Sequence, residues 1–479
     1  MRLWLWLLTT SGIIFLCGCK TLGIDMTRID IKPEPTVVTA PVTILPAQKW
    51  VENAPADFPT TDWVGSFSDE TLSALVAEAL NANTDIAAAA ASYQAALTRL
   101  QISQSDLRPR VSANADASRQ EFGNDFINDN SGFGYGVSAS WEADIWGRIK
   151  DQISSSELTS RASLADYAGV RLAIAGQVAQ SWFNLIEARL LTELAERDVE
   201  TLERALRLTT RRFEGGVTGS SDVRLARSSL AAAEATLASR QQVTAATARA
   251  LEILLRRYPA DALESPTDLP VLPSLSGAGD QAYILRKRPD LLAAERRMMA
   301  AGFDIDIARK NLLPRLDFSS GLNSNANALT NIFDFDSLVA NILGNLTHPI
   351  FQGGRLQANI EQQEYILRQL LENYASTVLT AYLEVENALD AETHLEQQEA
   401  ALRISLDEAI KAEERLESRY SEGLATILQL LDAQSRRISA ESQLIRARKE
   451  RLANRVRLHL ALGGGNETDQ ALQLASRGI

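Results

Sequence analysis

Few residues of this 479-residue chain have the types and spacing needed for bond chemistry. Its three histidines, His348, His394 and His459, lie far apart, and no Cys/His cluster or HExxH spacing accompanies them. A zinc site is therefore not expected. The sequence also contains no G-x-S-x-G turn and no phosphate-binding loop. We expect neither an enzyme nor a resident metal or cofactor.

The two cysteines, Cys17 and Cys19, end a mostly apolar run from Leu3 to Leu16 near the N-terminus. This run is too short to count as a structural membrane span. Leu16-Cys17-Gly18-Cys19 resembles a bacterial lipobox, in which the signal is cut before a cysteine that then carries lipid. We therefore expect residues 1–18 to be a lipoprotein signal peptide and Cys19 to be the lipid attachment site. An ordinary signal peptide with incidental cysteines is the alternative.

The residue after Cys19 bears on the cellular location of the protein, and the net charge bears on which partners it binds. An aspartate after the cysteine favours retention in the inner membrane in lipoproteins of this type, so Lys20 permits the outer membrane. Cleavage would leave Cys19 as the only cysteine, which excludes an internal disulfide. The net charge of −13 argues against nucleic acid as a partner.

A strictly alternating stretch predicts a β-strand with two different faces. One face carries large or apolar residues: Phe133, Tyr135, Val137, Ala139 and Trp141. The other face carries Gly134, Gly136, Ser138 and Ser140. Such a contrast suits a strand that faces lipid on one side. Three further strands are expected at residues 111–118, 316–323 and 338–346.

Long helical patterns lie before and after the strands. They cover about residues 72–107, 148–213 and 220–257 in the first half. The second would be about 100 Å long for about 65 residues, and its three-and-four apolar spacing suits coiled-coil packing. Gly215-Gly216 would turn the chain, and Ser220-Ser221-Asp222 would cap the returning helix.

The second half of the chain repeats the first. Gly147-Arg148 matches Gly354-Arg355, and Phe213 matches Tyr420, both at a distance of 207 residues. A register held over this length indicates a tandem duplication. We expect a lipid-anchored, proline-rich tether at residues 19–62, a first structural repeat at 63–257, a linker at 258–279, a second repeat at 280–463 and a flexible tail at 464–479.

The number of strands limits the kind of sheet or barrel that one chain can form. Strands of about nine to eleven residues suit a tilted membrane strand, but four cannot close a barrel. Open strand edges cannot lie in lipid, because their backbone groups would lack hydrogen bonds. Either these strands are not in a membrane, or several copies share one barrel. Two chains would give eight strands and a mostly filled interior, whereas three would give twelve and suit a solute pore better.

The motifs, in this order and in duplicate, resemble the outer-membrane efflux protein family of TolC-like channels, and within it the lipoprotein branch of the OprM and NodT type. The resemblance covers about residues 60–463. It is carried by the two turns after Phe213 and Tyr420 and by three stretches: Ser140-Trp141-Glu142-Ala143-Asp144-Ile145-Trp146-Gly147-Arg148, Arg288-Pro289-Asp290-Leu291 and Pro349-Ile350-Phe351-Gln352-Gly353-Gly354-Arg355.

The resemblance implies a mainly α fold with a small β part. Long antiparallel coiled-coil helix hairpins would form the tandem repeat, and four membrane β-strands per chain would complete a twelve-stranded barrel in a homotrimer. It also implies a lipid-anchored protein of the cell outer membrane with a periplasmic helical tunnel. Its partners would be a periplasmic adaptor (membrane fusion) protein and an inner-membrane pump.

The resemblance further implies that the two hairpin turns dock the adaptor. These adaptor-docking tips are Gly216, Val217 and Thr218 in the first repeat and Gly423, Leu424 and Ala425 in the second. A plainer alternative is that Gly216 and Gly423 only terminate helices. Both can hold, because a glycine C-cap with small exposed neighbours is also a compact docking surface.

A periplasmic gate is implied just past the second tip. Asp432 matches an acidic residue that lines the constriction in relatives, and we expect Leu428 and Leu431 to flank it on the packing side. Gln429 stands where some relatives carry a second aspartate, which leaves one or two acidic rings open. An ordinary solvated helix charge is the alternative for Asp432.

Tyr420 and Asp222 match positions that hold the closed mouth by hydrogen bonds in the family. Ala425 stands where a partner arginine occurs in some relatives, so we expect these hydrogen bonds to hold the mouth more weakly here.

We therefore expect a trimeric channel of a tripartite efflux system that exports small molecules from the periplasm or the inner-membrane pump. A channel for protein or peptide secretion and a periplasmic coiled-coil scaffold without a pore are the alternatives. A scaffold would bury the large residues of the first alternating stretch in protein, whereas a channel would expose them to lipid.

Overall fold

The computed structural model describes Trp50, Ala278 and Asp334 together with the ranges 62–120, 130–275, 281–326 and 338–465. All of these residues belong to one compact unit, Val42–Ile479. The expected signal peptide, the lipid site at Cys19, most of the tether and nearly all of the tail lie outside the described residues. The domain boundaries stay predictions.

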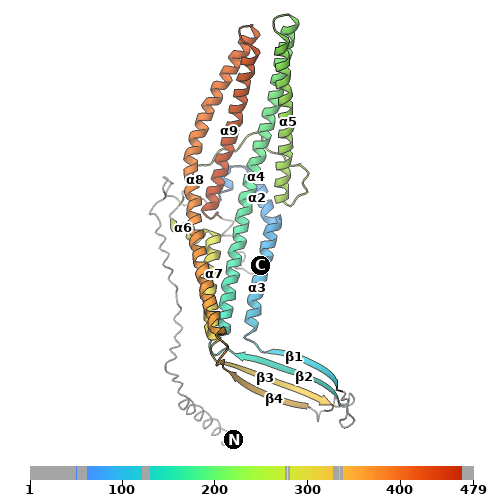
Figure 1. The fold of residues 1–479 in the computed structure, drawn as a ribbon, viewed down its shortest axis with the longest axis vertical. Helices are drawn as coiled ribbons and strands as arrows, with labels where there is room; N and C mark the ends of the chain where they lie inside the picture. Colours follow the sequence, from blue (N-terminus) through green and yellow to red (C-terminus); the bar gives the residue numbers. More distant parts are fainter. Residues whose placement is uncertain are drawn as a thin grey trace. The chain divides into compact units, whose positions relative to one another are not determined.

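Two hairpins of very long helices dominate the described part of the chain (Figure 1). The first joins α4 (Arg148–Glu214) to α5 (Ser220–Leu254), and the second joins α8 (Arg355–Ser421) to α9 (Ile427–Ala461). α4 and α8 contain 67 residues each, and α5 and α9 contain 35 each. The predicted helix hairpins are therefore confirmed in both copies.

Shorter helices complete each copy. In the first copy they are η3 (Gly65–Phe67), α2 (Glu70–Ala82) and α3 (Thr84–Ser105), and in the second they are α6 (Gln281–Lys287) and α7 (Pro289–Lys310).

The single helix expected over residues 72–107 is wrong, because the chain breaks at Asn83 into α2 and α3. The Asn83 side-chain oxygen caps α3 by accepting the N–H of Asp85 at 2.8 Å. Its Nδ2 donates to the carbonyl of Leu254, the last residue of α5, at 2.8 Å. Terminal carbonyls of a helix lack partners within the helix. The break therefore satisfies one end of α5 while it starts α3.

Arg288 occupies the equivalent position in the second copy. It precedes α7, and its Nη1 donates to the carbonyl of Ala461, the last residue of α9, at 3.0 Å. In both copies a polar side chain thus joins the start of a short helix to the end of a long one.

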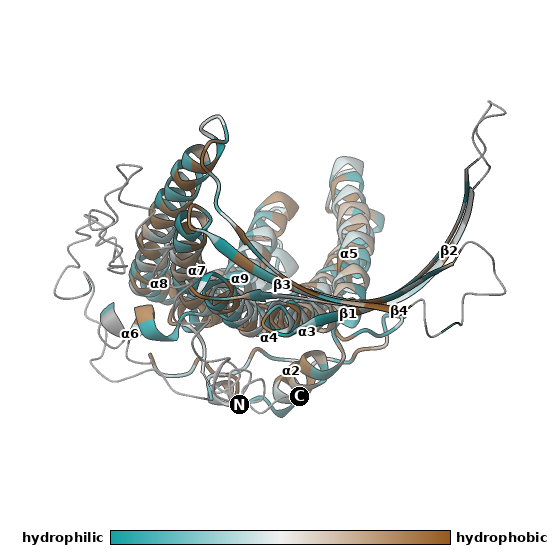
Figure 2. Cartoon of the chain, turned by 90° about the horizontal axis from the view of Figure 1, so that it is seen from below, coloured by the Kyte–Doolittle hydropathy of each residue, from teal (hydrophilic) through white to brown (hydrophobic). Residues whose placement is uncertain are grey.

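The four predicted strands are confirmed and form one antiparallel sheet in the order β1-β2-β3-β4. They are β1 (Arg110–Gln120), β2 (Asn130–Ala143), β3 (Arg315–Ala326) and β4 (Leu338–Thr347). Figure 2 shows that the sheet is strongly curved.

The register gives the sheet an apolar and a polar face. Trp141 pairs with Phe318, and their rings stack with centroids 5.9 Å apart. The same face carries Val137 and Ile342, which are 47% and 85% exposed in the single chain. Ser112, Ser138 and other small or polar residues lie opposite. These apolar side chains are thus not covered by the described residues of their own chain.

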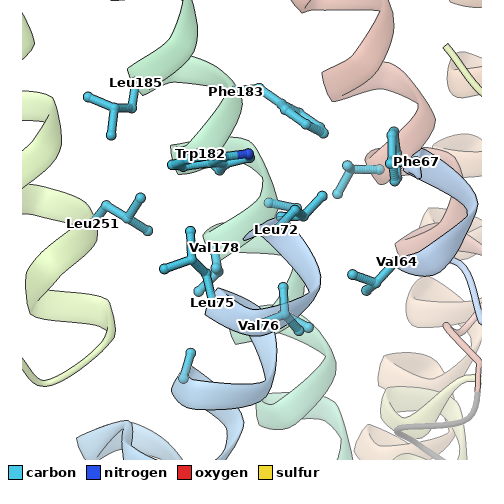
Figure 3. Packing of buried hydrophobic residues seen from close by; sticks show 14 of the residues in the cluster. Val64, Phe67, Leu72, Leu75, Val76, Val178, Trp182, Phe183, Leu185 and Leu251 are labelled. Carbon is cyan, nitrogen blue, oxygen red and sulfur yellow. The ribbon is translucent and has the colours of Figure 1, made fainter. Parts of the chain in front are cut away.

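The main core lies where α2 packs on α4 beside α5 (Figure 3). Leu72, Val178 and Trp182 are completely buried there. The Trp182 indole donates to one carboxylate oxygen of Asp69 at 2.8 Å, and the other oxygen accepts the N–H of Leu72 at 2.9 Å. Asp69 therefore caps α2 and anchors it to α4 at once.

His459 of α9 is buried without a hydrogen-bond partner for Nε2 among the described residues. Its ring stacks on Trp63 with centroids 5.8 Å apart. Burial and the nearby Arg455 lower the pKa of His459 to about 4. The histidine is consequently neutral at pH 7.

We expect acid to destabilise the protein through His459. An unfolded histidine has a pKa of about 6.5, so the unfolded state takes up more protons as the pH falls from 6.5 towards 4. This costs about 2 kcal/mol per chain at pH 5 and nothing above pH 7.5. Thermal unfolding at both pH values should show a larger acid loss in the wild type than in His459→Gln. An equal loss in both proteins would contradict this role.

Candidate functional site

The two hairpin tips have the same backbone geometry. Gly216 and Gly423 adopt left-handed conformations, with φ of 75° and 85°. The N–H groups of Val217 and Leu424 each donate to a carbonyl five residues back, at 2.8 Å. This is the Schellman form of helix C-cap, for which glycine is preferred. The capping role of both glycines is thus confirmed.

The tips also expose apolar side chains. Val217 and Leu424 are 65% and 64% exposed, whereas Thr218 and Ala425 are half-buried. The tips therefore combine a fixed backbone with one protruding aliphatic residue each. Docking at these tips stays a prediction.

Tyr420 joins the second hairpin to α4 just before the tip. Its side chain is 1% exposed, and its hydroxyl forms a hydrogen bond with the Thr209 hydroxyl at 2.8 Å. Arg212 donates to the Tyr420 carbonyl at 2.5 Å and lies over its ring at 4.9 Å from the centroid. Tyr420 thus holds the hairpins together through α4. Asp222 lies in the first turn of α5, and its role at the mouth stays a prediction. The expectation that Ser220, Ser221 or Asp222 caps this helix is wrong, because Gly219 is the N-cap and no side chain makes a capping hydrogen bond.

Thr209 and Arg212 were not found by sequence reasoning. Arg212 and Arg419 are equivalent in the two repeats, but only the first reaches across to the other hairpin through a described contact with Tyr420. The sequence did contain a signal for this contact, because the position of Phe213 in the first repeat is occupied by Tyr420 in the second. Only the tyrosine has a hydroxyl that needs a partner when buried.

Gln429 has a local role at the start of α9. Its side-chain oxygen accepts the Thr426 N–H at 3.0 Å, and its own N–H donates to the Thr426 hydroxyl at 3.3 Å. This is a capping box. The amide is therefore already occupied in this conformation.

Asp432 lies on the exposed side of α9. Its side chain is 60% exposed and forms an ion pair with Arg436 at 2.8 Å. Leu431 packs partly against Tyr420, but Leu428 is 64% exposed. The expectation that Leu428 lies on the packing side is wrong in the single chain, because it shares the exposed face of Asp432 one turn away.

A partly buried charge cluster below the tip also escaped sequence reasoning. Arg437 of α9 forms ion pairs with Glu413 of α8 and, at 2.9 Å, with Glu441. Arg197 of α4 reaches the same Glu441 at 2.7 Å. Burial raises the pKa of the Glu413 carboxyl, and Arg437 opposes that shift. The cluster links α4 to both helices of the second hairpin.

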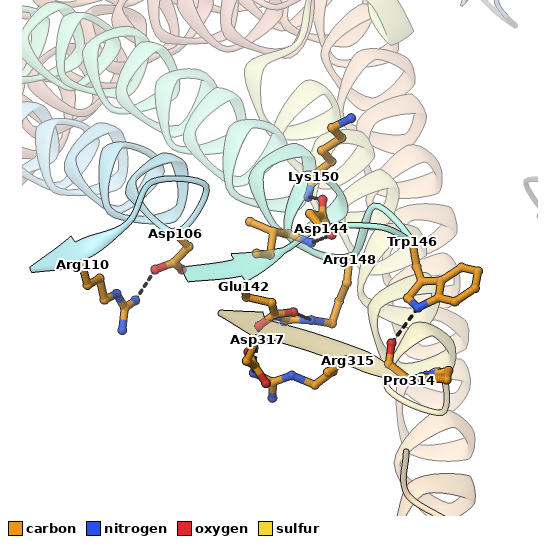
Figure 4. A network of polar contacts seen from close by, with 11 residues as sticks. Asp106, Arg110, Glu142, Asp144, Trp146, Arg148, Lys150, Pro314, Arg315 and Asp317 are labelled. Carbon is orange, nitrogen blue, oxygen red and sulfur yellow. Dashed lines mark hydrogen bonds and ion pairs between the residues drawn. The ribbon is translucent and has the colours of Figure 1, made fainter. Parts of the chain in front are cut away.

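The motif between β2 and α4 builds the junction of sheet and helices (Figure 4). Glu142 binds Arg148 through both carboxylate oxygens at 2.9 Å and also binds Arg315 of β3 at 2.8 Å. Asp144 accepts the N–H groups of the first turn of α4, and Trp146 donates to the Pro314 carbonyl at 2.7 Å. These contacts fix the strand-to-helix turn and tie the two repeats together.

The described ranges contain no group of three or more His, Cys, Asp or Glu residues placed to hold a metal ion. No helix in these ranges is both long and apolar enough to cross a membrane.

Comparison with known proteins gives a consistent result. The model of the outer membrane efflux protein family matches residues 75–255 and 283–464. The chain is 32% identical to the pyoverdine export outer membrane protein OpmQ of Pseudomonas aeruginosa over 85% of this chain and 88% of the relative. It is 28% identical to the cation efflux system protein CusC of Escherichia coli K12, over 88% and 92% of the two chains.

Solved structures are similar over most of their length. The outer-membrane channel OprN matches with a TM-score of 0.78 and 27% identity, covering 88% of this chain and 99% of that chain. The open state of the MtrE channel of Neisseria gonorrhoeae matches with a TM-score of 0.77 and 27% identity, covering 88% and 97%.

Proposed function

The chain belongs to the outer membrane efflux protein family, and on this premise we propose how its parts form a working channel. The protein is an outer-membrane efflux channel, and the family forms trimers that work with an adaptor and an inner-membrane pump. In our proposal the two hairpin tips dock the adaptor, the second tip carries the gate and Cys19 anchors the chain in lipid. The family is one of channels rather than enzymes.

The observation that carries the proposal is the sheet with two open edges. Among the described residues of one chain, β1 and β4 each have a neighbouring strand on one side only. Unpaired backbone groups in lipid cost several kcal/mol each, so the edges need partners from other copies. A trimer supplies them by joining β4 of one copy to β1 of the next. The apolar face would then meet lipid and the polar face would line the pore.

Small molecules are the proposed cargo. The names of the relatives, pyoverdine export and cation efflux, support small solutes over proteins. Widening of the mouth, rather than bond chemistry, would control passage. Tyr420 and its partners on α4 are the contacts that such a movement must break.

We expect Asp432→Asn to weaken cation preference in single-channel recordings. Three-fold symmetry would bring three copies of Asp432 near the axis, where like charges repel and carboxylates attract cations. The substitution removes three negative charges and frees three Arg436 side chains, so selectivity should shift toward anions and block by divalent ions should disappear.

Asp407→Asn is the matched control, because Asp407 forms an exposed ion pair with Lys411 four residues on in α8. It should leave selectivity unchanged while the trimer assembles normally in both variants. If conductance, selectivity and divalent block were the same in Asp432→Asn and the wild type, Asp432 would be an ordinary solvated charge.

Cys19→Ala is expected to abolish acylation of the chain. The lipid-bearing cysteine becomes the first residue after signal cleavage, so no other residue can take its place in the mature protein. Labelling of growing cells with a palmitate analogue, followed by isolation of the protein, measures this directly. Cys17→Ala serves as the control and should be labelled like the wild type; labelled Cys19→Ala protein would overturn the assignment.

A further inference from the structure

A cavity of about 950 Å³ lies where α9 ends and α7 begins. Its wall is formed by α4, α7, α8 and α9. Ala165, Gly169 and Ala173 of α4 contribute one side, and Ala388 and Ala391 of α8 contribute another. These small side chains leave the space open. We name this space the splice cavity. Its size lies within the range of small-molecule sites, about 300–1,000 Å³.

The splice cavity lies on the side of α4 that is opposite to α2. The α4 residues that face α2 and the core include Val178 and Trp182 (Figure 3). Gly169 and Ala173 of the cavity wall stand nine residues before Val178 and Trp182, respectively. Nine residues are two and a half helical turns, so the two pairs project from opposite sides of α4. Figure 2 shows α2 on the convex side of the curved sheet. A sheet that closes into a barrel keeps its concave side toward the lumen, so the cavity faces the lumen.

The charges around the cavity do not balance. The lining contains the carboxylates of Asp166, Asp290 and Glu384 but only two guanidinium groups, from Arg288 and Arg457. Two lining residues have partners outside the cavity, because Asp166 pairs with Arg297 and Arg457 pairs with Glu450. These partners add one charge of each sign.

One carboxylate therefore remains in excess beside Arg288. This arginine binds Asp290 at 2.7 Å and Glu384 at 2.6 Å and donates to the Ala461 carbonyl. Both Asp290 oxygens accept hydrogen bonds from Arg288, whereas Glu384 accepts from it through Oε2. The Asp290 and Glu384 side chains are nevertheless 46% and 48% exposed, so both carboxylates remain accessible at the cavity.

The remaining lining is apolar. Val170, Leu172, Pro289 and Leu460 contribute to it. An apolar surface with one uncompensated negative charge at its mouth favours a ligand with an apolar body and one positive charge.

We propose that the splice cavity binds amphipathic organic cations in the tunnel wall on their way out. This proposal rests on the proposed function, because only a channel would bring exported solutes to this surface. It adds a solute-binding site and a charge preference at the opposite end of α9 from the gate residue Asp432.

The first repeat does not reproduce the charges of the site. Arg288, Asp290 and Glu384 correspond to Asn83, Asp85 and Gln177. Asp85 lies in the first turn of α3, as Asp290 does in α7, but it does not line the splice cavity. Asp85→Asn is therefore a matched control for Asp290→Asn.

The test uses the purified trimer in lipid nanodiscs and equilibrium dialysis with tetraphenylphosphonium. Tetraphenylborate has the same shape and the opposite charge, and it serves as the comparison ligand. Above the partition of each ion into empty nanodiscs, we expect saturable binding of the phosphonium and much weaker saturable binding of the borate. Glu384→Gln and Asp290→Asn should each weaken phosphonium binding about 5- to 20-fold, since each removes one charge near the ligand. Each variant leaves Arg288 one carboxylate partner, so folding should be kept.

Ala391→Phe tests the place of binding, because it fills the cavity without changing charge, and it should also reduce binding. Asp85→Asn should bind like the wild type. Equal phosphonium binding in the wild type, Glu384→Gln and Ala391→Phe would overturn the proposal, as would equal binding of phosphonium and borate. Trimer assembly and bilayer conductance, measured on the same samples, report separately on the channel function.

Discussion

Tyr420→Ala is expected to give a channel that conducts several-fold more current than the wild type in planar bilayers. The tyrosine ring is buried between α4 and the second hairpin, and its loss leaves a cavity and an unpaired Thr209 hydroxyl. Truncation of a buried aromatic residue costs about 3–5 kcal/mol. Arg212 also loses the ring on which it lies. The closed arrangement of the hairpins is consequently destabilised more than an opened one.

Two variants distinguish the loss of the hydrogen bond between Tyr420 and Thr209 from the loss of aromatic packing. Tyr420→Phe keeps the ring and removes only the hydrogen bond, so a smaller increase is expected, consistent with about 1–2 kcal/mol for the unpaired partner. Phe213→Ala changes the equivalent position of the first repeat, which is 44% exposed, and it should conduct like the wild type. Wild-type conductance in Tyr420→Ala, with normal assembly, would show that this contact does not hold the mouth closed.

The repeating elements were predictable because their signals are local. Alternation along residues 133–141 fixes which side chains share a face, and the register of the sheet confirms it. The glycines at 216 and 423 were predictable for a similar reason, since a left-handed C-cap strongly favours glycine.

The helix breaks at Asn83 and Arg288 have a local and a distant cause, because Asn83 is a preferred N-cap residue and Pro289 stands in the first turn of α7. Both residues act on the carbonyl end of a helix more than 170 residues away in the chain. The alanine-rich sequence around Asn83 favours an uninterrupted helix. The capping bond from Asn83 to Asp85 is local, whereas no local pattern reports the contact of Asn83 with the end of α5.

The partners of the gate residues escaped prediction for a related reason. Heptad spacing shows that a helix packs against others, but it does not identify which ones. Tyr420 could have met any neighbouring helix, and it meets Thr209 of α4. Leu428 looked like a packing residue by type, yet the second hairpin leaves it exposed in the single chain.

Assembly of three copies through the strand edges is the central claim, and disulfide trapping between β1 and β4 tests it most directly. Native cysteines do not interfere with this experiment, because the only two in the sequence are Cys17 and Cys19. Ser112→Cys in β1 is combined in turn with Asn341→Cys, Leu343→Cys and Asn345→Cys in β4, all on the polar face. Within one chain β2 and β3 separate these strands by about 14 Å, too far for a disulfide.

Oxidation in the membrane is therefore expected to link only different chains. At least one of the three pairs should convert most of the protein into a species of three chains on a denaturing gel, with two-chain species as the intermediate and nothing larger. Ser112→Cys alone should remain a single chain. A ladder that stops at two or extends beyond three chains, or the absence of linkage in all three pairs, would contradict closure of the sheet by three copies.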